Sequence, residues 1–97
     1  MSHKNVLERR NIMYVVAVFI NRTQALQFAE VLRRMGVQCN IINTPREISN
    51  SCGLAVMFQS AKLGRARVVL NSGNFTGFKG FYNKKSTLNG AVYERVN

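Results

Sequence analysis

The chain has 97 residues, 46% of them hydrophobic, which is enough for one folded domain and too apolar for a disordered chain. Fourteen Lys and Arg residues against four acidic ones give a net charge of +10, which suits an anionic ligand or nucleic acid, although the same excess can serve solubility alone. No apolar run reaches the ~18 residues of a membrane span, so we expect no membrane partner. Two cysteines and no export signal indicate a reducing, cytoplasmic location.

The first half of the chain predicts a strand, a helix and a second strand. The run at 13–20 is apolar on both faces, which is typical of a central strand covered on two sides. Asn21 can cap a helix, and Gln24 can return the hydrogen bond in a capping box. The apolar residues that follow have helical spacing, and Gly36 supplies the left-handed turn that ends the helix. A strand at 37–42 comes next.

The second half begins with a polar loop at 43–53 and a strand at 54–58 that is again apolar on both faces. Ser60 predicts the cap of a second helix, and Gly73 predicts its end. The segment at 75–82 predicts a strand that glycines interrupt, as expected for a bulge or a sheet edge.

The element order β-α-β-β-α-β predicts an α/β (α+β) fold of the ferredoxin-like type. Right-handed crossovers give an antiparallel sheet in the order 4-1-3-2 with both helices on one face. That order places the two strands that are apolar on both faces, 13–20 and 54–58, at the centre. The sheet face without helices must then be covered by the C-terminal tail, by a second copy in a homodimer, or by another partner.

The chain divides into three predicted parts. Residues 1–11 form a flexible basic arm, and residues 12–83 form the ferredoxin-like domain. Residues 84–97 form a basic extension, in which the run at 91–96 can add a short extra strand.

The loop at 43–53 is longer than a hairpin needs and ends in a thiol, Cys52. In the predicted topology this loop lies where the first helix begins, at Asn21 and Arg22. The helix dipole and the charges of Arg22 and Arg46 should lower the pKa of the Cys52 thiol.

Two further loop residues fit a thiol site. Gly53 carries no side chain beside the sulfur, so another molecule can approach it, and Ser49 offers a hydrogen bond. The open alternative is that Cys52 is an ordinary, half-buried residue at the start of a strand. Cys39 shares an apolar strand face and is expected to be core. The two cysteines and His3 have no metal-site spacing, so we expect neither metal nor cofactor.

Residues 13–83 resemble a known family. The stretch "VVAVFINRTQALQFAEVLRRMGVQCNIINTPREISNSCG", followed by a short apolar strand, a helix and "FTGFKGFY", is similar to a bacterial domain of unknown function described as selenium or sulfur carrier-like. The most specific part is the run from Pro45 to Ser49 followed by Cys52 and Gly53. The resemblance implies a ferredoxin-like fold, Cys52 as the carrier thiol, and Arg46 and Ser49 as its companions. Its partners would be donor and acceptor proteins for sulfur or selenium.

A different class of function stays open, namely a small basic module that binds nucleic acid, or one that oligomerises and regulates. The segment "KGFYNKK" mixes rings with cations, as base-stacking surfaces do. The residues of this alternative site are Lys79, Phe81, Tyr82, Lys84 and Lys85. Catalysis by the chain alone is not expected, because it has no carboxylate pair, no Cys-x-x-Cys motif and no His in the predicted core.

Overall fold

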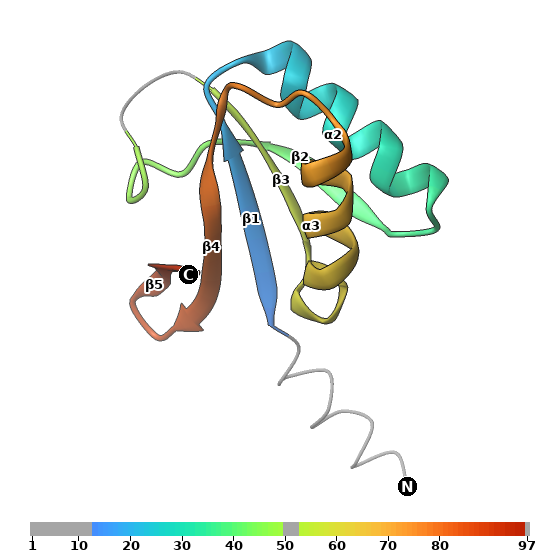
Figure 1. The fold of residues 1–97 in the computed structure, drawn as a ribbon. Coiled ribbons are helices and arrows are strands. Elements are labelled where there is room, and N and C mark those ends of the chain that lie inside the picture. The colour runs from blue at the N-terminus through green and yellow to red at the C-terminus, as the bar shows by residue number, and fades with distance from the viewer. Residues whose placement is uncertain (1–12, 50–52, 97) are drawn as a thin grey trace, which may run out of the picture.

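The computed structural model describes residues 13–49 and 53–96, which form five strands, two α-helices and one turn of 3-10 helix (Figure 1). In chain order they are β1 (Tyr14–Phe19), α2 (Arg22–Arg34), β2 (Cys39–Asn43), β3 (Leu54–Gln59), η1 (Ser60–Lys62), α3 (Leu63–Ser72), β4 (Phe78–Thr87) and β5 (Gly90–Arg95).

The strands form one antiparallel sheet in the order β2-β3-β1-β4-β5, so the predicted four-stranded order 4-1-3-2 is corrected to a five-stranded one. The additional strand, β5, pairs with the outer side of β4, with Tyr82 opposite Arg95 at one end of the ladder. β1 lies at the centre between β3 and β4. The mixed α+β architecture is therefore established, whereas the ferredoxin-like topology stays a prediction.

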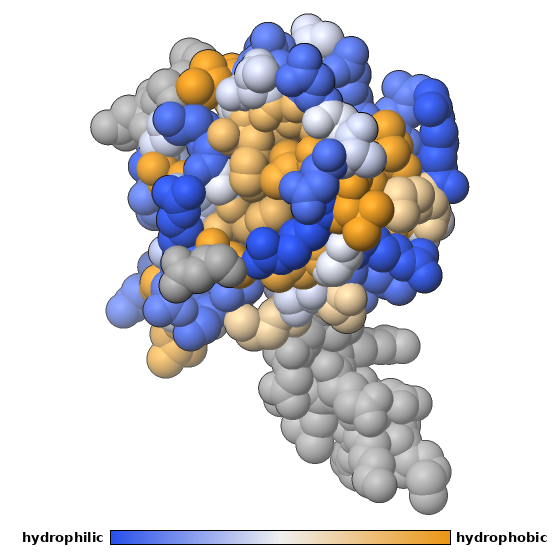
Figure 2. All heavy atoms as spheres, viewed as in Figure 1, coloured by the Kyte–Doolittle hydropathy of each residue, from blue (hydrophilic) through white to orange (hydrophobic). Residues whose placement is uncertain are grey.

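Both helices pack on one face of the sheet and enclose the main core with it (Figure 1). Alternate residues of β1 point into this core, together with Phe28 and Leu32 of α2 and Val69 of α3. Seen from the same side, apolar residues gather in the middle of this face, and polar residues surround them (Figure 2). Among the described residues, no helix is long and apolar enough to cross a membrane.

The opposite face of the sheet is also covered within the chain. Val16 and Val18 of β1 and Ala55 of β3 are at most 3% exposed there. Ile48, from the long loop, and Tyr93, from β5, pack against them. The C-terminal segment therefore contributes to covering this face, as one of the sequence-based alternatives proposed, and the loop contributes as well.

The signals at the ends of α2 act largely as predicted. The side chain of Asn21 accepts hydrogen bonds from the N–H groups of Thr23 and Gln24 at 2.9 and 3.3 Å. At the other end Gly36 has φ +82°, and the N–H groups of Gly36 and Val37 bond to the carbonyls of Arg33 and Leu32, both at 3.0 Å. This pair of bonds is the Schellman motif, which satisfies two carbonyls that the helix leaves open.

The second half of the predicted capping box is wrong. The side chain of Gln24 donates to the hydroxyl of Thr76 at 3.1 Å and accepts from the N–H of Gly77 at 2.7 Å. Gln24 therefore ties the start of α2 to the turn before β4, a distant contact that no local pattern indicates.

Two boundaries also differ from the sequence-based expectation. Ser60 does not cap a helix, because the short η1 turn intervenes, and neither η1 nor α3 has a side-chain cap. The last predicted strand, 75–82, begins only at Phe78 and continues to Thr87, because β5 supplies a pairing partner for the additional residues. The division expected at 83/84 thus falls inside β4.

Candidate functional site

The long loop begins and ends beside the last residue of β1. The N–H of Thr44, at its start, donates to the carbonyl of Gly53, at its end, over 3.2 Å. Gly53 lies against the backbone of Phe19, and the chain continues from there through Ile20 into the Asn21 cap of α2. The loop is therefore attached at the end of the sheet where α2 begins.

Gly53 is required for packing rather than only for access to a neighbouring sulfur. A Cβ atom at this position would lie 2.6 Å from the carbonyl oxygen of Phe19 and 3.4 Å from the hydroxyl of Thr44. The first distance is far shorter than a carbon–oxygen contact allows, and backbone cannot move aside as a side chain can. The absence of a side chain at Gly53 is what lets the loop close against β1.

The described part of the loop is a turn that lies against the second face of the sheet. The N–H groups of Ile48 and Ser49 bond to the carbonyl of Pro45 at 3.0 and 3.1 Å. Ile48 points into the apolar layer of that face, whereas Arg46 and Glu47 are exposed. Burial, with a smaller contribution from the negative charge of Glu47, raises the pKa of Tyr93 on β5.

Some of the backbone N–H groups at the start of α2 already have a hydrogen-bond partner. Asn21 occupies two of the N–H groups that could otherwise have received an anion. Arg22 is exposed in the first turn.

Of the two cysteines, the structure describes Cys39. Cys52 lies outside the described residues, and its covalent neighbour Gly53 lies inside them. Cys39 is 8% exposed in the main core, and its Sγ lies 3.6 Å from the carbonyl oxygen of Ala29. Burial raises the pKa of the Cys39 thiol, and the nearby guanidinium of Arg33 offsets part of that increase.

The segment assigned to the nucleic-acid alternative does not form one exposed surface. Phe81 is 4% exposed, and its ring packs in the core beneath the guanidinium of Arg67, so no base can stack on it. Tyr82 and Lys84 are half-buried, and Lys85 forms a 2.6 Å salt bridge with Glu94. The expectation of a stacking ring at Phe81 is therefore wrong.

Lys79, from the same segment, is exposed and lies at a cavity. It lines a small cavity of about 120 Å³ together with Val18, Ile48 and Tyr82, beside the base of the long loop. The remaining residues that line this cavity are Phe19, Ile20, Thr44 and Ser49. Sequence reasoning missed this grouping because it joins β1, β4 and the loop. The glycine inside the last predicted strand was the one local signal, since it indicated a bulge.

The rest of the described chain offers little for metal chemistry. No group of three or more His, Cys, Asp or Glu side chains lies close enough to hold an ion within residues 13–49 and 53–96. Another hollow, of about 530 Å³, is at the opposite end of β3, where it is lined by Arg33, Cys39 and Gln59 among others.

A comparison with protein-family models matches residues 14–83 to the family described as "Putative Se/S carrier protein-like". The match covers most of the chain, including the loop and both of its attachment points. The chain belongs to this family. Membership in the Se/S carrier-like family confirms the resemblance in the sequence and implies partners that transfer sulfur or selenium in general. No curated protein and no solved structure matches the chain.

Proposed function

We propose that this member of the Se/S carrier-like family carries sulfur or selenium on the thiol of Cys52. The observation that supports this most is that the other cysteine of the sequence, Cys39, is buried. The sequence has two cysteines, and Cys39 is in the core with a pKa that burial raises. A thiol acts as a nucleophile in its thiolate form, so Cys39 is unsuited to the chemistry that the family description implies.

The position of the loop also supports the proposal. Gly53, the residue after Cys52, is held against β1 at the end of the sheet where α2 begins. In the proposed site Arg22 and Arg46 lower the pKa of the thiol by their charge, and Ser49 provides a hydrogen bond. Asn21 holds the start of α2 in place.

The transfer needs no outside oxidant if the donor is a persulfide. The Cys52 thiolate attacks the outer sulfur of a donor R–S–SH, so that a bond forms between the two sulfurs and the donor leaves as R–S⁻. The product is Cys52–S–SH. A nucleophile on the acceptor then takes the outer sulfur and its proton, and Cys52 leaves as the thiolate. Selenium in the outer position follows the same course.

The test is the intact mass of the protein after incubation with a persulfide donor, followed by peptide mapping. The wild type should gain one sulfur atom on the peptide that contains Cys52. Cys52→Ser should gain none, and Cys39→Ser should gain as much as the wild type, since its change lies in the core. Because Cys39→Ser places a hydroxyl in an apolar site, it should also lower the free energy of unfolding by about 1–2 kcal/mol.

A second pair of variants examines the supporting charges. Arg22→Gln and Arg46→Gln should each raise the pKa of Cys52 without unfolding the protein, because both side chains are exposed. An adduct on Cys39, or none on either cysteine with several persulfide donors, would contradict the proposed function.

A further inference from the structure

We propose that the cavity beside Lys79 binds a small oxyanion, and that the sulfur-bearing anion thiosulfate is a ligand of this class. The choice of thiosulfate rests on the proposed function. The binding site itself rests on the cavity and charges of described residues, and it does not include Cys52.

A bulge in β4 turns Lys79 toward the cavity. Val18 of β1 pairs with Gly80 and Phe19 pairs with Phe78, so Lys79 is an extra residue in the ladder. Gly80 has φ +148°, which residues with a side chain rarely adopt. Bulges of this kind redirect a side chain and are common next to functional sites. Here Phe78 keeps its place in the main core, while Lys79 lines the cavity on the opposite face.

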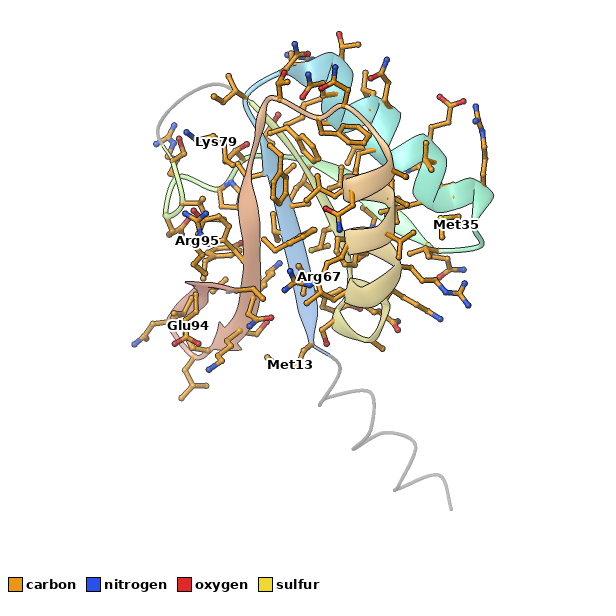
Figure 3. The ribbon with its side chains drawn as sticks, in the orientation of Figure 1. Met13, Met35, Arg67, Lys79, Glu94 and Arg95 are labelled. Carbon is orange, nitrogen blue, oxygen red and sulfur yellow. The ribbon has the colours of Figure 1, made fainter. Side chains whose placement is uncertain are left out.

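A second cation lies next to Lys79. A Cβ atom on Gly80 would be 3.3 to 3.4 Å from the guanidinium of Arg95, so Arg95 extends over the glycine that follows Lys79. Figure 3 shows Lys79 and Arg95 on the same side of β4, the side on which the loop lies. The two salt bridges found among the described residues are Arg34–Glu30 and Lys85–Glu94, and neither involves these two cations.

The cavity has the size and lining for a small ligand. Its volume of about 120 Å³ is well above the roughly 10–15 Å³ that a single water molecule needs, so the cavity has room for a small ligand. Val18 and Ile48 form apolar walls, and Lys79, whose side chain is exposed to solvent, can direct its ammonium to an anion bound there. Tyr82 lines the same cavity and carries a hydroxyl that can donate to the anion.

The experiment is an NMR titration of the amide signals with thiosulfate at constant ionic strength, with chloride as the reference salt. Saturable shifts should centre on Lys79, Gly80 and Tyr82. Lys79→Gln should weaken the binding about tenfold or more, as expected when a charge-assisted contact is lost. Arg95→Gln should weaken it by a smaller factor, because Arg95 lies next to the cavity without lining it. Lys62→Gln removes the same charge at the opposite end of β3, beyond Gln59, and should leave the affinity within about twofold.

Shifts spread over the whole surface, or equal losses in Lys79→Gln and Lys62→Gln, would overturn the proposal, since they show only general attraction to a basic protein. Cys52→Ser separates this site from the proposed function. It should bind thiosulfate as the wild type does and form no persulfide. If the wild type forms the Cys52 persulfide from a protein donor and shows no saturable anion binding, the carrier function stands and the oxyanion site fails. Saturable binding together with an inert Cys52 would mean that the oxyanion site stands and the carrier function fails.

Discussion

At the scale of single residues, the contacts of Cys39 decide its chemistry. Its sulfur lies in the core, 3.6 Å from the carbonyl oxygen of Ala29, where a thiolate would lose its hydration and face a like partial charge. The guanidinium of Arg33 donates to the backbone carbonyl of Cys39 at 3.0 Å. Its positive charge lies near the thiol and offsets part of the effect of burial on the pKa. Burial is the larger effect, so the pKa of this thiol is raised.

The raised pKa of Cys39 predicts how stability depends on pH. Above the ~8.5 of a free thiol, the unfolded chain loses its Cys39 proton before the folded chain does. The free energy of unfolding should therefore fall as the pH rises above about 8.5. The fall should end once the pH exceeds the pKa that Cys39 has in the folded protein. Denaturant unfolding between about pH 7 and pH 10 measures this slope.

Cys39→Ala should remove the part of the slope that the Cys39 thiol causes. Tyr93→Phe is the second variant to measure, because burial raises the pKa of Tyr93 too and so contributes to the slope. Identical slopes in the wild type and Cys39→Ala would mean that this thiol is not desolvated.

Two glycines give opposite predictions for the same substitution. Gly53→Ala forces a Cβ atom to within 2.6 Å of the Phe19 carbonyl oxygen, so it should lower the free energy of unfolding by roughly 1–3 kcal/mol. Gly64 lies in α3 with no atom within 4 Å of an added Cβ, so Gly64→Ala should raise it by up to about 1 kcal/mol. Thermal denaturation of both variants measures the difference. Equal effects would show that the loop does not close tightly on β1.

At the scale of elements, the long loop serves as part of the wall of the fold. Its turn at 45–49 places Ile48 on the second face of the sheet, beside β5 and its Tyr93. Without this cover, Val16 and Val18 at the centre of the sheet would meet water. The loop thus has a structural role through Ile48, and it also contains Cys52, which lies outside the described residues.

Ile48→Ala should lower the free energy of unfolding by about 1–3 kcal/mol, because a half-buried aliphatic side chain is lost from that layer. Ile20 is 57% exposed, and Ile20→Ala is the matched control with an expected effect within about 0.5 kcal/mol. Urea unfolding of both variants measures the contrast. A loss no larger in Ile48→Ala than in Ile20→Ala would contradict the covering role of the loop.

The parts of the fold that the sequence could predict are those set by neighbouring residues. Asn21 and Gly36 mark the ends of α2 because a cap and a left-handed turn need only local residues. The partners of Gln24 and Ile48 could not be predicted, since they lie on other elements and are fixed only when the layers pack. Among the site residues, the burial of Cys39 followed from its alternating strand pattern, whereas the turning of Lys79 depended on the exact register of β4 against β1.

At the scale of the whole molecule, both faces of the sheet are covered within one chain. The main core lies under the helices, and the loop and β5 cover the other face. A homodimer through the second face would need these covers to move away. The chain should therefore not associate through that face.

Light scattering should give the mass of a single 11.0 kDa chain for the wild type over a wide range of concentrations. Tyr93→Ala removes part of the cover and should make the mass rise with concentration, because apolar surface of β1 and β3 is uncovered. Lys85→Ala, on the neighbouring strand, leaves that layer intact and is the control. A stable wild-type dimer that Tyr93→Ala disrupts would show that the second face is an interface after all.

The most direct measurement is the rate at which each cysteine of the folded protein is alkylated as a function of pH, followed by mass mapping of the two peptides. Cys52 should react first at neutral pH, with an apparent pKa below the ~8.5 of a free thiol, while Cys39 reacts only as the protein unfolds. Unfolding in denaturant should make the two rates similar. If Cys52 is inert in the folded protein, or titrates above a free thiol, the carrier function is contradicted.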